Sequence, residues 1–427
     1  MVWLATACLT VACLFLITEA FWRRSEFYTY PFLAGSMFLT FILPQIPGLA
    51  NDVLMPDGFM LRAVCFSTLC LVMCVAGWQF GQRSEAKWDW VFSEKHLLQF
   101  AAALSIVGAY FFHKFGELGD EERLRGFLSG TAVAYLFFAR LLTYGLAIAL
   151  LCLARRYSRL ALAIVAFDCL FYFDRIVIAG RRGDAAEFAL MIALALWFQK
   201  RWIVPRWAVA VSLVFTIVGL LGAGEYRAAT YYSGKPDWQA VTNIDLAANW
   251  DALINGGGPE FRNLAYSMAF IEENNAYDFG ADHWNTLVNS YVPAQLVGSA
   301  LKDSLYIDAP PVFPAGYIPA PGTTPTGMMD AFASFWYFGC LKFALIAAIL
   351  GCIYKAAMRG NTTMQLLYML SVMPSMLAIT HFTNEILIAW VHIIGFILPG
   401  LIYARMRGVP KPETPRDGVP AVVRQAA

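Results

Sequence analysis

Residues 59–81 read FMLRAVCFSTLCLVMCVAGWQFG, an apolar run whose single charge, Arg62, stands near its start. About 20 consecutive apolar residues in a helix cross the hydrocarbon core of a bilayer, because each residue adds about 1.5 Å along the helix axis. The run therefore predicts a transmembrane helix. Similar runs recur along most of the chain, so the sequence predicts an all-α polytopic membrane protein.

The composition supports the same class. Of the 427 residues, 59% are hydrophobic and only 14% are charged, whereas soluble domains are about half apolar and about a quarter charged. These values exclude a disordered chain, a nucleic-acid-binding protein and a secreted disulfide scaffold. The net charge of +1 indicates no electrostatic partner for the chain as a whole.

The apolar runs predict about eleven transmembrane helices. The expected spans are residues 2–20, 27–49, 59–81, 97–115, 129–153, 159–179, 185–199, 206–224, 331–354, 363–380 and 384–404.

Basic residues in short loops predict the orientation, since Lys and Arg near the ends of spans stay in the cytoplasm. With eleven spans, all the basic clusters fall on one side, which puts the N-terminus outside and the C-terminus inside. These clusters are Arg23 and Arg24; Arg155, Arg156 and Arg159; Lys200, Arg201 and Arg206; Lys355 and Arg359; and Arg405, Arg407, Lys411 and Arg416.

The spans divide the chain into four parts. Residues 1–224 hold eight helices, 225–330 form one large external loop, 331–408 hold the last three helices, and 409–427 form a cytoplasmic tail. A loop of roughly a hundred residues is too long for a connector and predicts a functional segment. Apolar spacing within it predicts helices at 261–275 and 282–297, and Pro and Gly predict irregular chain after Asp303.

Arg181 and Arg182 stand at the external end of the sixth span, where the orientation rule disfavours them. A bound anion explains the two charges, and so does pairing with Asp184 or Glu187.

Charged residues inside predicted spans include a group near the middle of the chain, and ions placed in a span pair with one another or mark a pathway. The group consists of Arg140, Asp168, Asp174 and Arg175. Arg140 paired with Asp168 or Asp174 is one interpretation. The other is that Arg140 and Arg175 line a cavity for an anion that continues to Arg181.

Two arginines of the loop, Arg227 and Arg262, extend this hypothesis. Arginine suits two-pronged contact with phosphate, although a single arginine in a loop is also typical of a solvated surface. Loop aromatics such as Trp238, Trp250 and Trp284 suit sugar rings or the membrane interface.

The candidates for proton transfer are Asp282, His283 and Asp330. A histidine beside a carboxylate is a possible general base, and an ordinary surface histidine is the alternative. The chain has no phosphate-binding loop, dinucleotide fingerprint, nucleophile elbow or metal-ligand spacing, so no cofactor and no metal are expected. The nine cysteines stand in apolar spans and are interpreted as packing residues.

Three stretches resemble the bacterial oligosaccharide repeat-unit polymerases, the O-antigen polymerase (Wzy-type) family. They are GRRGD at 180–184, NTLVNSYVP at 285–293, and GTTPTGMMDAF at 322–332 followed by FWYFG at 335–339. The likeness covers roughly residues 160–355. It departs from the family at Pro293-Ala294, where many members have Arg after the proline, and at Lys302-Asp303, where they have Lys-Pro.

The resemblance implies an enzyme of the bacterial inner membrane whose large loop is periplasmic. It would join oligosaccharide repeat units carried on undecaprenyl diphosphate into O-antigen or exopolysaccharide. A flippase and a chain-length regulator would be its partners, and it would need no metal. The alternatives are a ligase that transfers finished glycan to a lipid acceptor and, with less support, a flippase, which would show internal repeats or broken helix pairs.

Overall fold

The computed structural model describes residues 1–406 except 51, 53, 54, 57, 85–89, 120–129, 233, 234 and 321. The described residues contain helices and no strand, and nine helices among them are long and apolar enough to cross a membrane. The chain is thus an all-α, multi-pass membrane protein.

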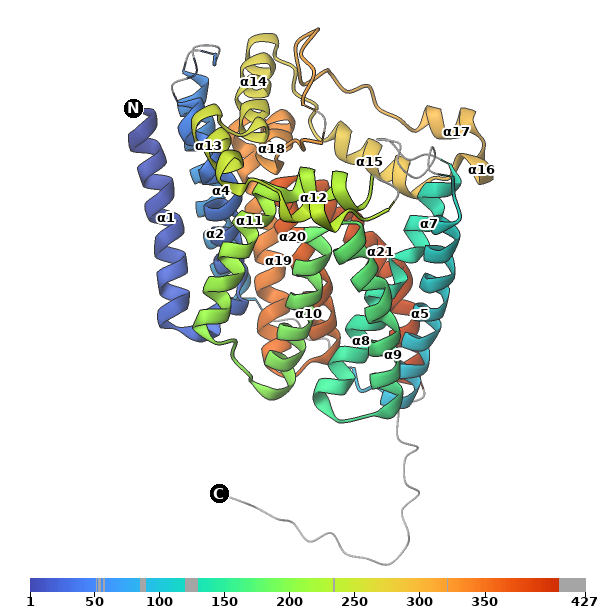
Figure 1. The fold of residues 1–427 in the computed structure, drawn as a ribbon. Coiled ribbons are helices and arrows are strands. Elements are labelled where there is room, and N and C mark those ends of the chain that lie inside the picture. The colour runs from blue at the N-terminus through green and yellow to red at the C-terminus, as the bar shows by residue number, and fades with distance from the viewer. Residues whose placement is uncertain are drawn as a thin grey trace, which may run out of the picture.

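The bundle helices run along one another, and the helices of the large loop gather at one end of the bundle (Figure 1). The bundle consists of α1 (Val2–Trp22), α2 (Tyr30–Met37) continued to α3 (Ile46–Leu49), α4 (Phe59–Gly81), α5 (Glu94–Gly116), α7 (Thr131–Ala139) with α8 (Leu141–Arg155), α9 (Arg159–Phe173), α10 (Arg182–Lys200), α11 (Arg206–Thr230), α18 (Gly327–Phe335), α19 (Cys340–Met358), α20 (Thr362–Thr380) and α21 (Asn384–Met406). The loop helices are α12 (Trp238–Thr242), α13 (Leu246–Gly256), α14 (Pro259–Asn274), α15 (Ala281–Tyr291), α16 (Ala294–Val297) and α17 (Ser299–Ser304).

The expected count of eleven spans is reached only in part. Segments 159–179 and 185–199 are helical, as α9 and α10, but neither is among the nine candidate spans in the described residues. α9 has only 15 residues before it becomes a π-helical turn at Asp174–Ile178. α10 carries charged residues in both its first and its last turn, which lowers its hydropathy.

The basic turns lie together at the end of the bundle away from the loop helices. Arg155 donates to Thr362 Oγ1 at 2.7 Å, Arg201 donates to the Met358 carbonyl at 2.6 Å, and Arg206 donates to the Phe21 carbonyl at 2.8 Å. Hydrogen bonds between these turns require them to be neighbours. The predicted grouping of the basic clusters at 23–24, 155–159, 200–206 and 355–359 is therefore present. Arg407, Lys411, Arg416 and the predicted tail at 409–427 lie outside the described residues.

The large loop packs onto the bundle through α14, which lies against α4 and α18. Phe261, Leu264 and Met268 of this helix are fully buried. The Gln45 side chain accepts a hydrogen bond from the backbone N–H of Phe261 at 3.0 Å, and Arg62 pairs with Glu272 at 2.6 Å. The loop is therefore anchored to the ends of the spans by apolar contact and by polar bonds.

The predicted loop helices are found with one correction. Segment 261–275 is α14, but segment 282–297 is broken into α15 and α16. The break falls at Pro293, which has no N–H to continue the helix. Two short helices, α12 and α13, were not expected. At the loop's ends, α11 extends to Thr230 and α18 begins at Gly327, so Asp330 lies within a helix.

α4 and α19 pack closely because small residues face each other. A Cβ added at Gly77 would lie 2.0 Å from the Ala344 carbonyl oxygen, and one at Gly81 would lie 2.0 Å from that of Ala348. Glycines four residues apart let two helix backbones approach in this way.

Gly77→Val is expected to destabilise the protein by about 1–3 kcal/mol, because the added carbons force α4 and α19 apart. Thermal unfolding in detergent measures the change. The matched control is Gly395→Val in α21, where an added Cβ meets nothing within 4 Å. Equal melting temperatures for the two variants would contradict the close packing.

Candidate functional site

A cavity of about 330 Å³ lies at the loop end of the bundle, where α5 ends, α8 and α10 begin and α11 leads into the loop. We call it the arginine cavity. Three arginines line it together with three carboxylate residues: Arg140, Arg175, Arg181, Asp174, Asp184 and Glu187. The structure thus brings together three of the six arginines that the sequence singled out.

Arg175 is neutralised within this cavity. Its Nε lies 2.9 Å from Asp184 Oδ2 and a terminal nitrogen lies 2.6 Å from Asp184 Oδ1, a two-pronged ion pair. The guanidinium also stacks over the Tyr172 ring, 5.0 Å from its centroid. Arg175 is therefore a structural cation that fixes one wall of the cavity.

Arg140 and Arg181 differ from Arg175 because no described residue forms an ion pair with either within 4 Å. Arg140 stands at the junction of α7 and α8, and Arg181 immediately precedes α10. Asp168, one of the partners considered for Arg140, instead accepts a hydrogen bond from Ser105 at 2.8 Å. Arg140 and Arg181 remain available to an anion in the cavity.

Glu187 is the carboxylate of the cavity that a hydroxyl group orients. The Tyr172 hydroxyl donates to Glu187 Oε2 at 2.9 Å and lies 2.8 Å from Thr143 Oγ1. Glu187 comes one helical turn after Asp184 in α10, so both carboxylates face the same cavity.

The other three arginines do not line the cavity. Arg182 donates to the Gly219 carbonyl of α11 at 3.1 Å and lies within electrostatic reach of Arg227. Arg227 has a buried Nε without a partner. Arg262 pairs with Asp52 at 3.5 Å and donates to the Gly256 carbonyl at 3.0 Å. The six arginines therefore do not form one common site among the described residues.

Asp330 and His283, two of the proton-transfer candidates, meet in a different place, the Asp330–Lys342 cluster, formed by Asp330, Lys342, Thr383, Ser334 and His283. Asp330 is 5% exposed and accepts hydrogen bonds from the backbone N–H and the hydroxyl of Thr383. Lys342 Nζ lies 3.6 Å from Asp330 Oδ1 and 2.8 Å from Ser334 Oγ. The cluster joins α18, α19 and the start of α21.

His283 joins the loop helix α15 to this cluster. Its Nε2 lies 2.9 Å from Thr383 Oγ1 and 3.2 Å from Lys342 Nζ, while its Nδ1 is buried without a partner. Burial, and then the positive charge of Lys342, lower the pKa of His283 to about 4, so the ring is neutral at pH 7. Burial raises the pKa of the neighbouring Asp282. The three candidates are absent from the described lining of the arginine cavity.

Sequence reasoning missed Lys342 and Thr383. A signal for Lys342 was present, because it is the only charge in the apolar stretch from Ala331 to Tyr354 and a lone ion in a span has a partner or a role. Thr383 gave no signal, since its contacts come from a segment 53 residues earlier in the chain.

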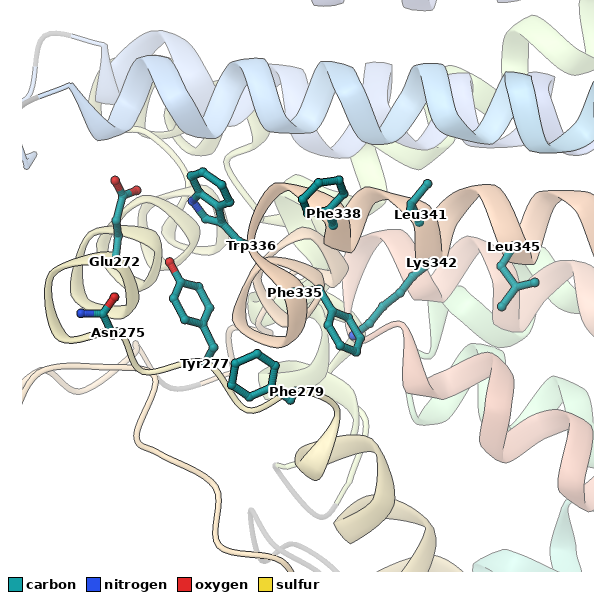
Figure 2. Close-up of a pocket in the computed structure, with 10 residues that line it drawn as sticks. All are labelled: Glu272, Asn275, Tyr277, Phe279, Phe335, Trp336, Phe338, Leu341, Lys342 and Leu345. Atoms are coloured by element: carbon teal, nitrogen blue, oxygen red, sulfur yellow. The ribbon is translucent and has the colours of Figure 1, made fainter.

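Lys342 also borders an apolar groove of about 860 Å³ on the outside of the bundle. Figure 2 shows Phe335 and Trp336 at the turn before α19, with Leu341 and Leu345 further along that helix and Tyr277 and Phe279 across from them. Phe338 and Leu345 are 70% and 62% exposed. Apolar side chains left bare on a spanning helix are those that lipid covers.

Among the described residues, no group of three or more His, Cys, Asp or Glu side chains is placed so that it could hold a metal ion. The nine cysteines are all free.

Comparisons with family profiles, curated proteins and solved structures found no match for this chain. The class that the fold defines is the multi-pass membrane protein.

The stability that His283 and His381, the residue after α20, contribute to the protein is expected to fall as the pH is lowered from 7 to 5. Burial is the main cause that lowers the pKa of both His283 and His381 to about 4, whereas a histidine in the unfolded chain titrates near 6.5. The unfolded state therefore binds more protons in this range, and stability that is full above pH 6.5 is lost toward pH 4. Melting temperatures in detergent measure the slope, which H283Q/H381Q should flatten. A slope unchanged by the double substitution would refute this assignment.

Lys342→Met is expected to destabilise the protein by about 3–5 kcal/mol, because it leaves the Asp330 carboxylate buried without its cation. D330N/K342M removes both charges and should recover part of that loss. Thermal unfolding of the two single variants and the double variant completes the comparison. Additive losses would show that the two side chains do not interact.

Proposed function

We propose that this protein joins undecaprenyl-diphosphate-linked oligosaccharide repeat units into O-antigen or exopolysaccharide on the periplasmic face of the bacterial inner membrane. The observation that carries the proposal is the arginine cavity, where Arg140 and Arg181 face a common space without an ion-pair partner among the described residues. The resemblance around residues 180–184 includes one of these arginines.

The reaction explains why cations are needed there. A sugar hydroxyl of one lipid-linked unit attacks the anomeric carbon of the growing chain, and undecaprenyl diphosphate leaves with the bonding electrons. Negative charge grows on the diphosphate as its bond to the sugar breaks. Guanidinium groups held in place lower the energy of that charge, and their planar donors match phosphate oxygens.

The position of the cavity fits a substrate that is a membrane lipid. The cavity lies at the loop end of the bundle, and the diphosphate head group of the lipid is proposed to bind there. The loop helices gather at the same end (Figure 1) and carry the exposed rings of Trp238, Trp250 and Trp284, which suit sugar faces. The bilayer is the medium of the reaction, and a flippase and a chain-length regulator are the proposed partners.

A ligase that passes finished glycan to a lipid acceptor is the alternative, since it uses the same leaving group. Purified protein supplied with a lipid-linked repeat unit alone separates the two activities. A ladder of products supports the polymerase, whereas transfer only to an added lipid acceptor supports the ligase. Movement of the lipid across vesicles without new glycosidic bonds would support the flippase.

Arg140→Ala and Arg181→Ala are each expected to shorten the polymer, because removal of one charge-stabilising donor raises a barrier by about 2–4 kcal/mol. Glycan chain length in a deletion strain complemented with each variant measures the effect. Arg182→Ala should have a smaller effect, since the Arg182 guanidinium donates a hydrogen bond to the Gly219 carbonyl. Arg156→Ala, exposed among the basic turns, is the matched control. Long polymer from both cavity variants at normal protein level would end the proposal.

A further inference from the structure

Glu187 is unusual among the carboxylates of the arginine cavity because Arg175, a cation of the same cavity, forms its ion pair with Asp184 instead. Asp184 engages Arg175 through both carboxylate oxygens, and within 4 Å no described cation pairs with Glu187. Glu187 is thus a carboxylate in a polar cavity with no structural ion pair to account for it. Carboxylates are costly to bury without such a partner, so its retention there calls for a role.

Its orientation is set from one side. The Tyr172 hydroxyl donates to Oε2, and that hydroxyl is itself 2.8 Å from Thr143 Oγ1. Tyr172 and Thr143 are both buried, on α9 and α8. Two helices therefore fix one oxygen of Glu187, and none of the described residues hydrogen-bonds Oε1 in the cavity that Arg140 and Arg181 also line.

We infer that Glu187 is the general base of the glycosyl transfer and Tyr172 is the residue that positions it. The inference rests on the proposed function and deepens it. The acceptor hydroxyl oxygen forms the new bond to the anomeric carbon while its proton passes to Glu187 Oε1. The bond from the anomeric carbon to the diphosphate oxygen breaks, and its electron pair leaves on the diphosphate beside Arg140 and Arg181. The proton is then released to water.

The side chains that the sequence offered as bases are placed less well for this step. Asp330 accepts from Thr383 and is paired with Lys342, so its oxygens are already used. His283 lies in the same cluster and has its Nε2 between Lys342 and Thr383. Neither lines the arginine cavity as described, so neither can reach a hydroxyl that attacks beside Arg140 and Arg181.

The experiment measures initial rates of polymerisation with detergent-purified protein and a lipid-linked repeat unit isolated from a polymerase-deletion strain. Glu187→Gln keeps the shape and removes the basic oxygen, so kcat is expected to fall about 10²- to 10⁴-fold with KM unchanged. Tyr172→Phe should lower kcat less, again without a change in KM. Glu273→Gln, an exposed site on α14, is the matched control and should keep the wild-type rate.

A binding measurement separates a catalytic from a structural role. Farnesyl diphosphate serves as a short polyprenyl diphosphate probe, titrated by microscale thermophoresis. Glu187→Gln should bind it as the wild type does and melt at the same temperature, whereas Arg181→Ala should bind it weakly. If Glu187→Gln fails to fold, Glu187→Ala with added formate replaces it, and turnover restored by formate supports the base.

The outcomes distinguish this inference from the proposed function. Folded Glu187→Gln with a wild-type kcat, or folded Glu187→Ala that formate does not revive, overturns the base assignment. If Arg140→Ala and Arg181→Ala both lose polymer in the same set of experiments, the proposed function is still supported. A wild-type protein that makes no polymer from the purified unit overturns both.

Discussion

The ion pair between Arg175 and Asp184 sets the chemistry available at the loop end of the bundle. It joins the π-helical turn that ends α9 to the first turn of α10 with two hydrogen bonds. Arg175 and Asp184 bind each other through both carboxylate oxygens. The N–H donors of Arg140 and Arg181 and one oxygen of Glu187 are therefore left for a ligand. Two unpaired cations and one oriented carboxylate around one cavity are the parts that transfer to or from a diphosphate-linked sugar requires.

The Asp330–Lys342 cluster differs from the arginine cavity because its two charged side chains, Asp330 and Lys342, pair with each other. Asp330 holds the backbone and hydroxyl of Thr383, Lys342 bridges Asp330 and Ser334, and His283 brings α15 of the loop into contact with them. A buried ion pair of this kind fixes one arrangement of the elements that it joins. The cluster therefore holds the loop helix α15 against the end of the bundle.

The sequence predicted the membrane class and the grouping of the basic turns from composition and from charge next to apolar runs. It also singled out Arg140 and Arg175, because a charge inside a span is costly. It singled out Arg181 because the orientation rule disfavours arginine at the external end of a span. The spans that it predicted in 159–199 are helices in the structure, α9 and α10, but they are not among the nine candidate spans of the described residues. It did not link His283 and Asp330 to Lys342 and Thr383, because these contacts form only in the folded chain.

Local chemistry in the sequence determined which long segments are apolar helices and which turns are basic, because both depend on residues close together in the chain. Only the tertiary structure decided which charged side chains form ion pairs with each other. Arg175 and Arg181 are the same residue type, six positions apart in the sequence. In the structure Arg175 forms an ion pair with Asp184, whereas Arg181 lines the cavity without an ion-pair partner among the described residues. The distinction is a matter of distances between α9, α10 and the junction of α7 with α8, and helix packing alone sets those distances.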